Sequence, residues 1–99
     1  MTFRDHPELV DDLLSRAIYY SDYSEAAADS FLQHYEEIVA RIRSNPEMFG
    51  RIEAEVRAVR VRPYRDVVYY TLHRDVWYTL AVLPGGVDDR RWRERLANL

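Results

Sequence analysis

The 99-residue sequence contains no cysteine, no lysine and only three glycines. Without cysteine there is no disulfide framework and no thiolate to bind a metal or to act as a nucleophile. Without lysine there is no glycine-rich phosphate loop of the type that ends in a lysine. The longest apolar run, Val76 to Leu83, is far shorter than the ~20 residues of a membrane span, and no basic-then-apolar leader opens the chain. We therefore expect a cytoplasmic protein without membrane association, with one domain over residues 1–99.

Histidines are few and scattered. His6, His34 and His73 lie far apart, and no two of them share a turn of helix. Metal-binding histidines usually recur at short, regular spacings, so we expect neither a metal nor a cofactor. The hydrophobic share of 47% and the aromatic share of 13% predict a folded core and exclude a disordered chain.

The two halves of the chain carry opposite charge. All 14 basic residues are arginine. Residues 1–49 hold four arginines and ten acidic residues, whereas residues 50–99 hold ten arginines and seven acidic residues. The overall charge of −3 is thus the sum of an acidic half at −6 and a basic half at +3. This asymmetry predicts a basic surface built by the second half.

The first half predicts a short strand followed by two helices. Thr2 to Asp5 forms the possible strand. The next apolar residues recur at helical spacing: Leu9, Val10, Leu13, Leu14, Ala17 and Ile18. The polar face opposite them holds Glu8, Asp11, Asp12, Ser15 and Arg16. Ser24 can cap a second helix, which the Asn45-Pro46 pair ends because a residue before proline avoids the helical region. Two long helices joined by a short link predict an antiparallel hairpin.

The second half predicts strands. Met48 to Glu53 is expected to be a loop, after which Val59 to Arg62 alternates with the period of a strand. Val67 to Leu72 and Val76 to Leu83 follow as two more strands joined by short turns. A short helix with Trp92 and Leu96 on one side closes the chain, with Asp88 and Asp89 as possible caps. The predicted fold is α+β, in the order β-α-α-β-β-β plus a short C-terminal helix, with the helix hairpin packed on one face of a small antiparallel sheet.

In the last two predicted strands, the side chains on both faces are apolar. A strand covered on one face should alternate between apolar and polar residues, but the stretches Val67 to Tyr70 and Val76 to Leu83 do not. The helix hairpin can cover only one face, so the other face is expected to expose Tyr69, Trp77, Ala81 and Leu83, or their neighbours of opposite parity. Exposed apolar patches usually mark an interaction site. A protein partner, the first strand, the C-terminal helix or a second copy could cover this face.

A cluster of arginines follows the predicted strand and turn after residue 56. It consists of Arg57, Arg60, Arg62 and Arg65, with Tyr64 among them. Arginine binds phosphate and carboxylate oxygens through two parallel hydrogen bonds, so the cluster suits either a nucleic-acid backbone or an acidic protein partner. The parity of Arg57 points it toward the helices instead, where an intramolecular partner is expected. His73, in the next turn, is an exposed candidate for proton transfer.

Four patterns occur in a characteristic order along nearly the whole chain. They are the second helix ending at Asn45-Pro46 and followed by Phe49, the run Arg57-x-Val59-x-Val61 with Pro63-Tyr64 after it, the apolar hairpin around His73, and the stretch Asp88-Asp89-Arg90-Arg91-Trp92-Arg93-Glu94-Arg95. Together they resemble the RelE/ParE superfamily of bacterial toxins. The resemblance implies the toxin of a type II toxin–antitoxin system, neutralised by a cognate antitoxin in a hetero-oligomeric complex.

Within this superfamily the sequence is closer to ParE-like members, which act on DNA gyrase. Pro84, Gly86 and Val87 stand where such toxins often carry a histidine and arginines. The lysines and the C-terminal tyrosine used by RelE-like ribonucleases are missing too, so the resemblance favours a binding function over an enzymatic one. The candidate partner-binding residues are Tyr69, Trp77, Arg60, Arg62, Arg65, Trp92, Arg93 and Arg95.

Two alternatives stay open. The first is a metal-independent endoribonuclease that cuts mRNA on the ribosome, for which the catalytic candidates are Arg57, Arg60, Arg62, Arg65, Tyr64 and His73. There the arginines would hold phosphate and stabilise the charge that develops in the transition state. The second is a protein-binding module without toxicity, or an inactive toxin.

Overall fold

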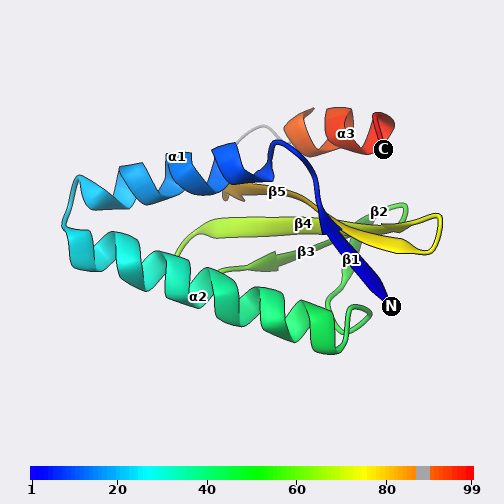
Figure 1. The fold of residues 1–99 in the computed structure, drawn as a ribbon, viewed down its shortest axis with the longest axis horizontal. Coiled ribbons are helices and arrows are strands. Elements are labelled where there is room, and N and C mark those ends of the chain that lie inside the picture. The colour runs from blue at the N-terminus through cyan, green and yellow to red at the C-terminus, as the bar shows by residue number, and fades with distance from the viewer. Residues whose placement is uncertain (87–89) are drawn as a thin grey trace.

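The computed structural model describes residues 1–86 and 90–99 of the chain (Figure 1). Its elements are β1 (Thr2–Asp5), α1 (Leu9–Ser21), α2 (Glu25–Ser44), β2 (Arg51–Glu53), β3 (Val56–Arg60), β4 (Asp66–His73), β5 (Val76–Pro84) and α3 (Arg90–Ala97). The predicted α+β order with a helix hairpin is confirmed. Asp88 and Asp89, expected to cap the last helix, lie outside the described residues.

The local signals at the helix ends act as the sequence predicts. Ser24 caps α2 because its side-chain oxygen accepts a hydrogen bond from the backbone N–H of Ala27 at 3.0 Å. The helix ends at Ser44, directly before the Asn45-Pro46 pair. None of the described helices combines the length and the hydropathy that a membrane span requires.

The sheet has five strands in the order β1-β5-β4-β3-β2. Strands β2 to β5 form an antiparallel meander, but β1 pairs parallel with β5, so the sheet is mixed and not wholly antiparallel as expected. Part of the predicted loop before β3 is a short strand, β2, which pairs with the start of β3 through Arg51–Arg57 and Glu53–Val56. Three residues give too short a pattern for a strand to be predicted from periodicity.

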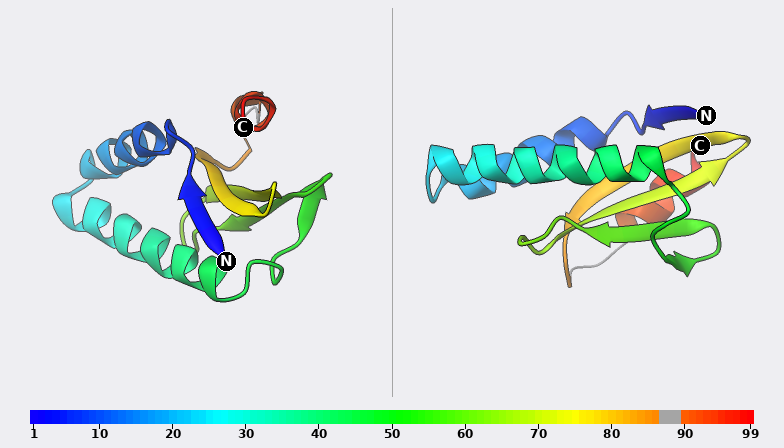
Figure 2. Two further views of the ribbon diagram at one scale, coloured as in Figure 1. Left: turned by 45° about the vertical axis from the view of Figure 1, so that its right-hand side comes forward. Right: turned by 90° about the horizontal axis from the view of Figure 1, so that it is seen from below.

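Helices cover both faces of the sheet (Figure 2). The hairpin of α1 and α2 packs on one face, in a core that includes Phe31, Ile38, Val68, Trp77 and Val82. Helix α3 packs on the other face, in a second core built by Val56, Leu80, Ala81, Leu83 and Trp92. We call these the hairpin core and the α3 core. Of the coverings that the sequence left open, the C-terminal helix is the one observed within this chain.

A β-bulge explains why β5 is apolar in both parities. The pairing of β4 with β5 shifts between Tyr69–Ala81 and Tyr70–Thr79, which leaves Leu80 as the extra residue. Such an extra residue reverses the alternation beyond it. Leu80 and Ala81 therefore both belong to the α3 core, whereas Trp77 and Val82, on either side of them, belong to the hairpin core. The expectation that Trp77 lies on an exposed face is wrong, because only 6% of it is exposed.

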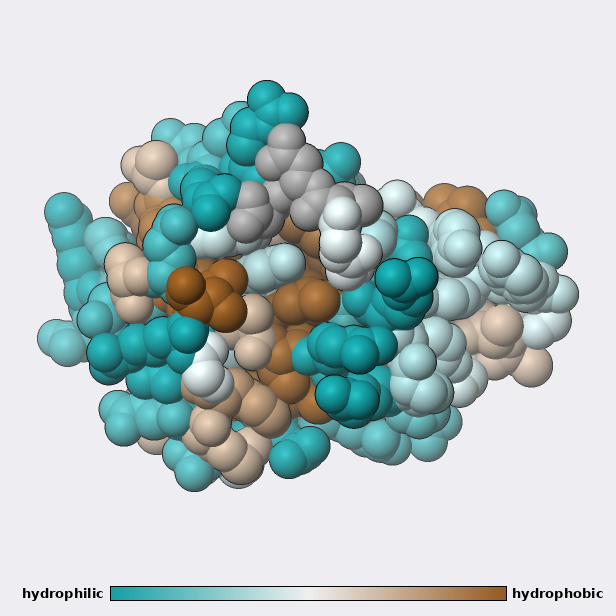
Figure 3. Space-filling model, turned by 180° about the vertical axis from the view of Figure 1, so that it is seen from behind, coloured by the Kyte–Doolittle hydropathy of each residue, from teal (hydrophilic) through white to brown (hydrophobic). Residues whose placement is uncertain are grey.

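Helix α3 leaves part of its sheet face uncovered. It is eight residues long, and Tyr69, Tyr78 and Leu99 at the border of its core are only partly buried. Figure 3 shows that apolar side chains reach the surface in the middle of one broad face of the molecule, bordered by hydrophilic ones. The expectation that Ala81 and Leu83 are exposed is wrong, because helix α3 buries both, and of the four residues expected to be exposed only Tyr69 stays partly exposed.

Candidate functional site

Arg57 is an internal residue of the fold. Its parity on β3 turns it toward the hairpin, as predicted, and it is 9% exposed. The Nη1 atom of Arg57 donates hydrogen bonds to the carbonyl oxygens of Glu47 at 3.0 Å and Phe49 at 2.7 Å. Its partners are thus backbone carbonyls and not carboxylates. Through these two hydrogen bonds, Arg57 stabilises the connection between α2 and β2.

The other three arginines of the cluster are exposed. Arg60, Arg62 and Arg65 surround the turn between β3 and β4, which contains a cis peptide bond between Arg62 and Pro63. Arg60 donates a hydrogen bond through Nη2 to the carbonyl oxygen of Tyr64 at 3.3 Å. With Arg41, the side chains of Arg60 and Arg62 line a groove of about 450 Å³ between α2 and β3, where His34, Glu37, Ile38, Phe49, Ala58 and Val59 complete the lining. An exposed guanidinium group of this kind suits carboxylate or phosphate.

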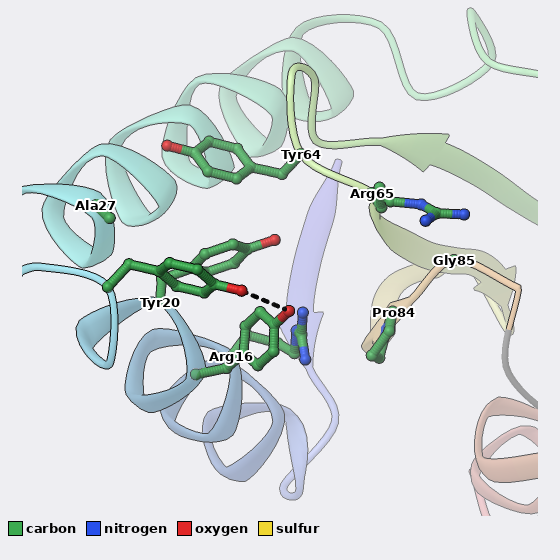
Figure 4. Close-up of a pocket in the computed structure, with 9 residues that line it drawn as sticks. Arg16, Tyr20, Ala27, Tyr64, Arg65, Pro84 and Gly85 are labelled. Carbon is green, nitrogen blue, oxygen red and sulfur yellow. Dashed lines mark hydrogen bonds between the residues drawn. The ribbon is translucent and has the colours of Figure 1, made fainter.

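A second pocket, of about 550 Å³, lies on the other side of the same turn (Figure 4). Its lining is rich in tyrosine and consists of Arg16, Tyr19, Tyr20, Tyr23, Ala27, Tyr64, Arg65, Pro84 and Gly85. The Tyr64 hydroxyl donates to Ser30 Oγ at 2.7 Å, and its ring packs edge-on against Tyr20 and Phe31. Tyr64 is therefore part of the packing between the turn and the hairpin.

The buried carboxylate of Asp66 binds two of the side chains that line this pocket. Asp66 is fully buried and accepts hydrogen bonds from Arg16 Nε and from the Tyr20 hydroxyl. Burial raises the pKa of Tyr20 to about 12, and the bond to Asp66 raises it as well. Burial by itself lowers the pKa of Arg16, but the Asp66 carboxylate outweighs this effect and the pKa of Arg16 rises. These two side chains therefore keep their protons at neutral pH.

Gly85 closes the pocket at the end of β5. Its N–H donates to the carbonyl oxygen of Arg65 at 2.8 Å. A Cβ atom at this position would lie 2.5 Å from the same oxygen, which no larger residue can accept without a backbone shift. The glycine thus fixes the position of the backbone beside Arg65.

His73 does not join the arginines. It ends β4, whereas Tyr64 and Arg65 directly precede the start of that strand. An eight-residue strand is about 23 Å long at ~3.3 Å per residue, so His73 and this turn lie at opposite ends. The histidine is also half-buried, not exposed as expected, with its ring edge-on to Tyr78. The structure thus brings Arg60, Arg62, Arg65 and Tyr64 together but leaves out His73 and Arg57.

The C-terminal candidates hold α3 on the sheet. Trp92 is fully buried and its ring stacks on Tyr69 with centroids 5.7 Å apart. Arg93 forms two hydrogen bonds of 3.1 Å with the Glu53 carboxylate, and the bond from Arg93 lowers the pKa of Glu53. Arg95 is buried against Asp12. A role of Trp77, Trp92 or Arg95 in partner binding stays a prediction, and it would require these side chains to leave the two cores.

The predicted faces of α1 are wrong for two residues, Asp12 and Arg16. Both were expected on the polar, exposed side of α1, but Asp12 is 4% exposed and Arg16 is half-buried. Asp12 binds Arg95 Nη1 at 2.6 Å and Nη2 at 2.9 Å, and it also accepts the backbone N–H of Val82 at 3.0 Å. A charged residue on an amphipathic helix is expected to be exposed to solvent, unless a residue that pairs with it in the interior is known. These partners lie 70 and 83 residues away, so the pattern on the helix could not show them.

Among the described residues, no cluster of three or more histidine, cysteine or acidic side chains could hold a metal ion. Of the residues predicted to act together, the structure gathers Arg60, Arg62, Arg65 and Tyr64 around the two adjoining pockets.

The fold has counterparts among solved structures. It is similar to a chain of a structure described as "Chromosomal ParDE TA system from P. aeruginosa", with a TM-score of 0.75 and 16% sequence identity. The match covers 86% of this chain and 96% of that chain. No protein-family model and no curated protein matches the sequence. The resemblance that the sequence indicated is therefore confirmed at the level of the fold, which is ParE-like.

Proposed function

We propose that this protein is the ParE-like toxin of a type II toxin–antitoxin system. It inhibits bacterial growth by binding a cytoplasmic target resembling DNA gyrase, and a cognate antitoxin neutralises it in a hetero-oligomeric complex. The observation that carries the proposal is the shared fold with a chain of a ParDE system, which extends over nearly the full length of both chains. A fold supports several functions, so the surface must agree with the assignment as well.

The surface suits an acidic, partly apolar protein segment. Arg60, Arg62 and Arg65 are exposed at one end of the sheet, and Tyr69 is half-buried at the uncovered part of the face on which α3 packs. Arginine and tyrosine are the residue types enriched in protein interfaces. We assign antitoxin binding to these four residues and to Arg93, whose side chain is 44% exposed. Trp77, Trp92 and Arg95 support this surface from the two cores.

The ribonuclease alternative has weaker support. Its candidate set does not gather at one place, because Arg57 binds backbone carbonyls and His73 lies at the far end of β4. General acid–base catalysis needs its groups within hydrogen-bond reach of one substrate. A non-toxic binding module would keep the arginine surface and lack any effect on growth.

Regulated expression in a bacterial host tests the proposal. We expect growth arrest with filamentation and double-strand DNA breaks, relieved by co-expression of the antitoxin from the neighbouring reading frame. Codon-linked cuts in mRNA would overturn the gyrase assignment in favour of the ribonuclease. Folded protein without effect on growth would contradict both toxin functions.

Charge reversal tests the surface itself. The triple variant Arg60→Glu, Arg62→Glu, Arg65→Glu should lower affinity for the antitoxin at least about tenfold, because charges opposite an acidic partner become repulsive. The matched control is Arg74→Glu, since Arg74 is an exposed arginine in the turn at the opposite end of β4. Equal affinity of the triple variant and the control, with melting curves like that of the wild type, would remove the arginines from the interface.

A further inference from the structure

Helix α1 exposes a row of large apolar side chains. Val10 is 64% exposed, Leu14 59% and Ile18 56%. Residues four apart lie one above the other on the same face of a helix, so the three form one continuous row, here called the α1 stripe. An ordered row of this kind on a single helix face is more than the scattered apolar exposure usual for a protein surface.

The α1 stripe is the part of the apolar face of α1 that does not pack in the hairpin core. The predicted apolar face of α1 held six residues, of which Leu9 and Leu13 pack in the hairpin core. The buried side of α1 is completed by Asp12, which binds α3, and by Tyr20. Nothing within the described residues covers the stripe: α2 and the sheet occupy the opposite side of the helix.

The exposed charges on the chain segment that contains the stripe are of one sign, although Arg91 of α3 lies beside the start of α1, 3.9 Å from Asp12. From residue 8 to residue 37, every exposed charged side chain is acidic: Glu8, Asp11, Asp22, Glu25, Asp29, Glu36 and Glu37. The single arginine of this stretch, Arg16, is paired with the buried Asp66. The α1 stripe therefore lies in a mainly acidic part of the hairpin, whose exposed arginines, Arg41 and Arg43, are in the last turn of α2. Two copies that faced each other through this part would repel.

We infer that the α1 stripe is the docking site for a basic amphipathic helix of another protein. Such a helix would lay apolar residues spaced i, i+4, i+8 against Val10, Leu14 and Ile18, and its flanking arginines or lysines would face the acidic residues of the hairpin. This site is separate from the arginines of the β3–β4 turn, which attract a partner of opposite charge. The molecule thus has two binding surfaces that select for different partners and that can be occupied together.

Two synthetic peptides test the site. The first is an ~18-residue peptide, about 27 Å long as a helix, with leucine on one face and arginine on both flanks. The second is identical except that glutamate replaces arginine. Binding of each peptide to the full-length protein is measured by fluorescence anisotropy, and amide chemical shifts map the contact. We expect only the arginine peptide to bind, with shift changes centred on α1.

Variants of the protein locate the contact. Leu14→Asp and Ile18→Asp should each weaken binding of the arginine peptide at least tenfold, and their exposed positions leave the fold intact. The matched control is Ile52→Asp, because Ile52 is 51% exposed but lies on β2. This control should bind within twofold of the wild type.

Three results would overturn the inference. They are equal binding of the two peptides, absence of binding by either at millimolar concentration, and unchanged affinity in Leu14→Asp. Sedimentation analysis adds a fourth: dimers that form in the wild type and vanish in Leu14→Asp would show that a second copy covers the stripe.

Discussion

Two buried carboxylates, Asp12 and Asp66, tie distant segments of the chain together. Each binds an arginine and one further donor: Asp12 binds Arg95 and the N–H of Val82, and Asp66 binds Arg16 and the hydroxyl of Tyr20. A buried charge is tolerated only when it is paired and hydrogen-bonded. Removal of one donor should therefore be felt in stability and in its pH dependence.

Tyr20→Phe tests the Asp66 site. At pH 7 the variant should be less stable by about 1–2 kcal/mol, because Asp66 loses a hydrogen bond. The pKa of Tyr20 is raised from 10.0 to about 12 in the folded protein. The stabilisation linked to this shift is therefore complete below about pH 10 and is lost as the pH rises toward 12.

Urea unfolding between pH 7 and pH 12 measures this effect. The sequence has no lysine, so lysine titration does not obscure this range. Tyr20→Phe should lose stability less steeply than the wild type above pH 10. Parallel slopes for wild type and Tyr20→Phe would contradict the assignment.

The elements themselves were largely predictable, but the contacts between them were not. Strand Thr2–Asp5, both hairpin helices, the cap at Ser24 and the last helix follow from local periodicity and capping, which act over a few residues. The parallel pairing of β1 with β5 and the bulge at Leu80 depend on residues far apart in the chain.

The same limit applied to the candidate site. The inward direction of Arg57 followed from strand parity, because that rule is local. The burial of Trp77 and the anchoring of α3 by Arg95 did not, since the bulge changes the parity and Asp12 belongs to another element. The apolar excess of α1 was visible in the sequence, but not which half of it would face solvent.

Anchoring of α3 by the Asp12–Arg95 pair can be tested with a double variant. Asp12→Ala alone should destabilise by about 3–5 kcal/mol, because Arg95 then remains buried without a carboxylate. Adding Arg95→Met removes the unpaired charge and should restore at least about half of this loss. Denaturant unfolding of the single and double variants gives the coupling free energy. Losses that simply add would show that the pair does not hold α3.

At the scale of the whole molecule, the sheet joins two cores with one tryptophan each. Trp77 lies in the hairpin core and Trp92 in the α3 core. Strand β5 contributes side chains to both cores, and Asp12 links α1 to α3 directly. Because the cores share a strand and an ion pair, we expect them to unfold in one cooperative step, as is usual for domains of this size.

Single-tryptophan variants measure whether the two cores unfold together. Trp92→Phe leaves Trp77 as the reporter of the hairpin core, and Trp77→Phe leaves Trp92 as the reporter of the α3 core. Each substitution creates some empty volume and should cost about 1–3 kcal/mol, so fluorescence is compared with circular dichroism of the same variant and not between variants. The indole nitrogen of Trp92 has no hydrogen-bond partner in the described part of the chain, so Trp92→Phe breaks no hydrogen bond. We expect the fluorescence and the circular dichroism to share one midpoint in each variant.

A Trp92 signal that changes at lower denaturant than the circular dichroism would instead show that α3 detaches first. The face of the sheet beneath α3 would then be available to a partner without unfolding of the hairpin core.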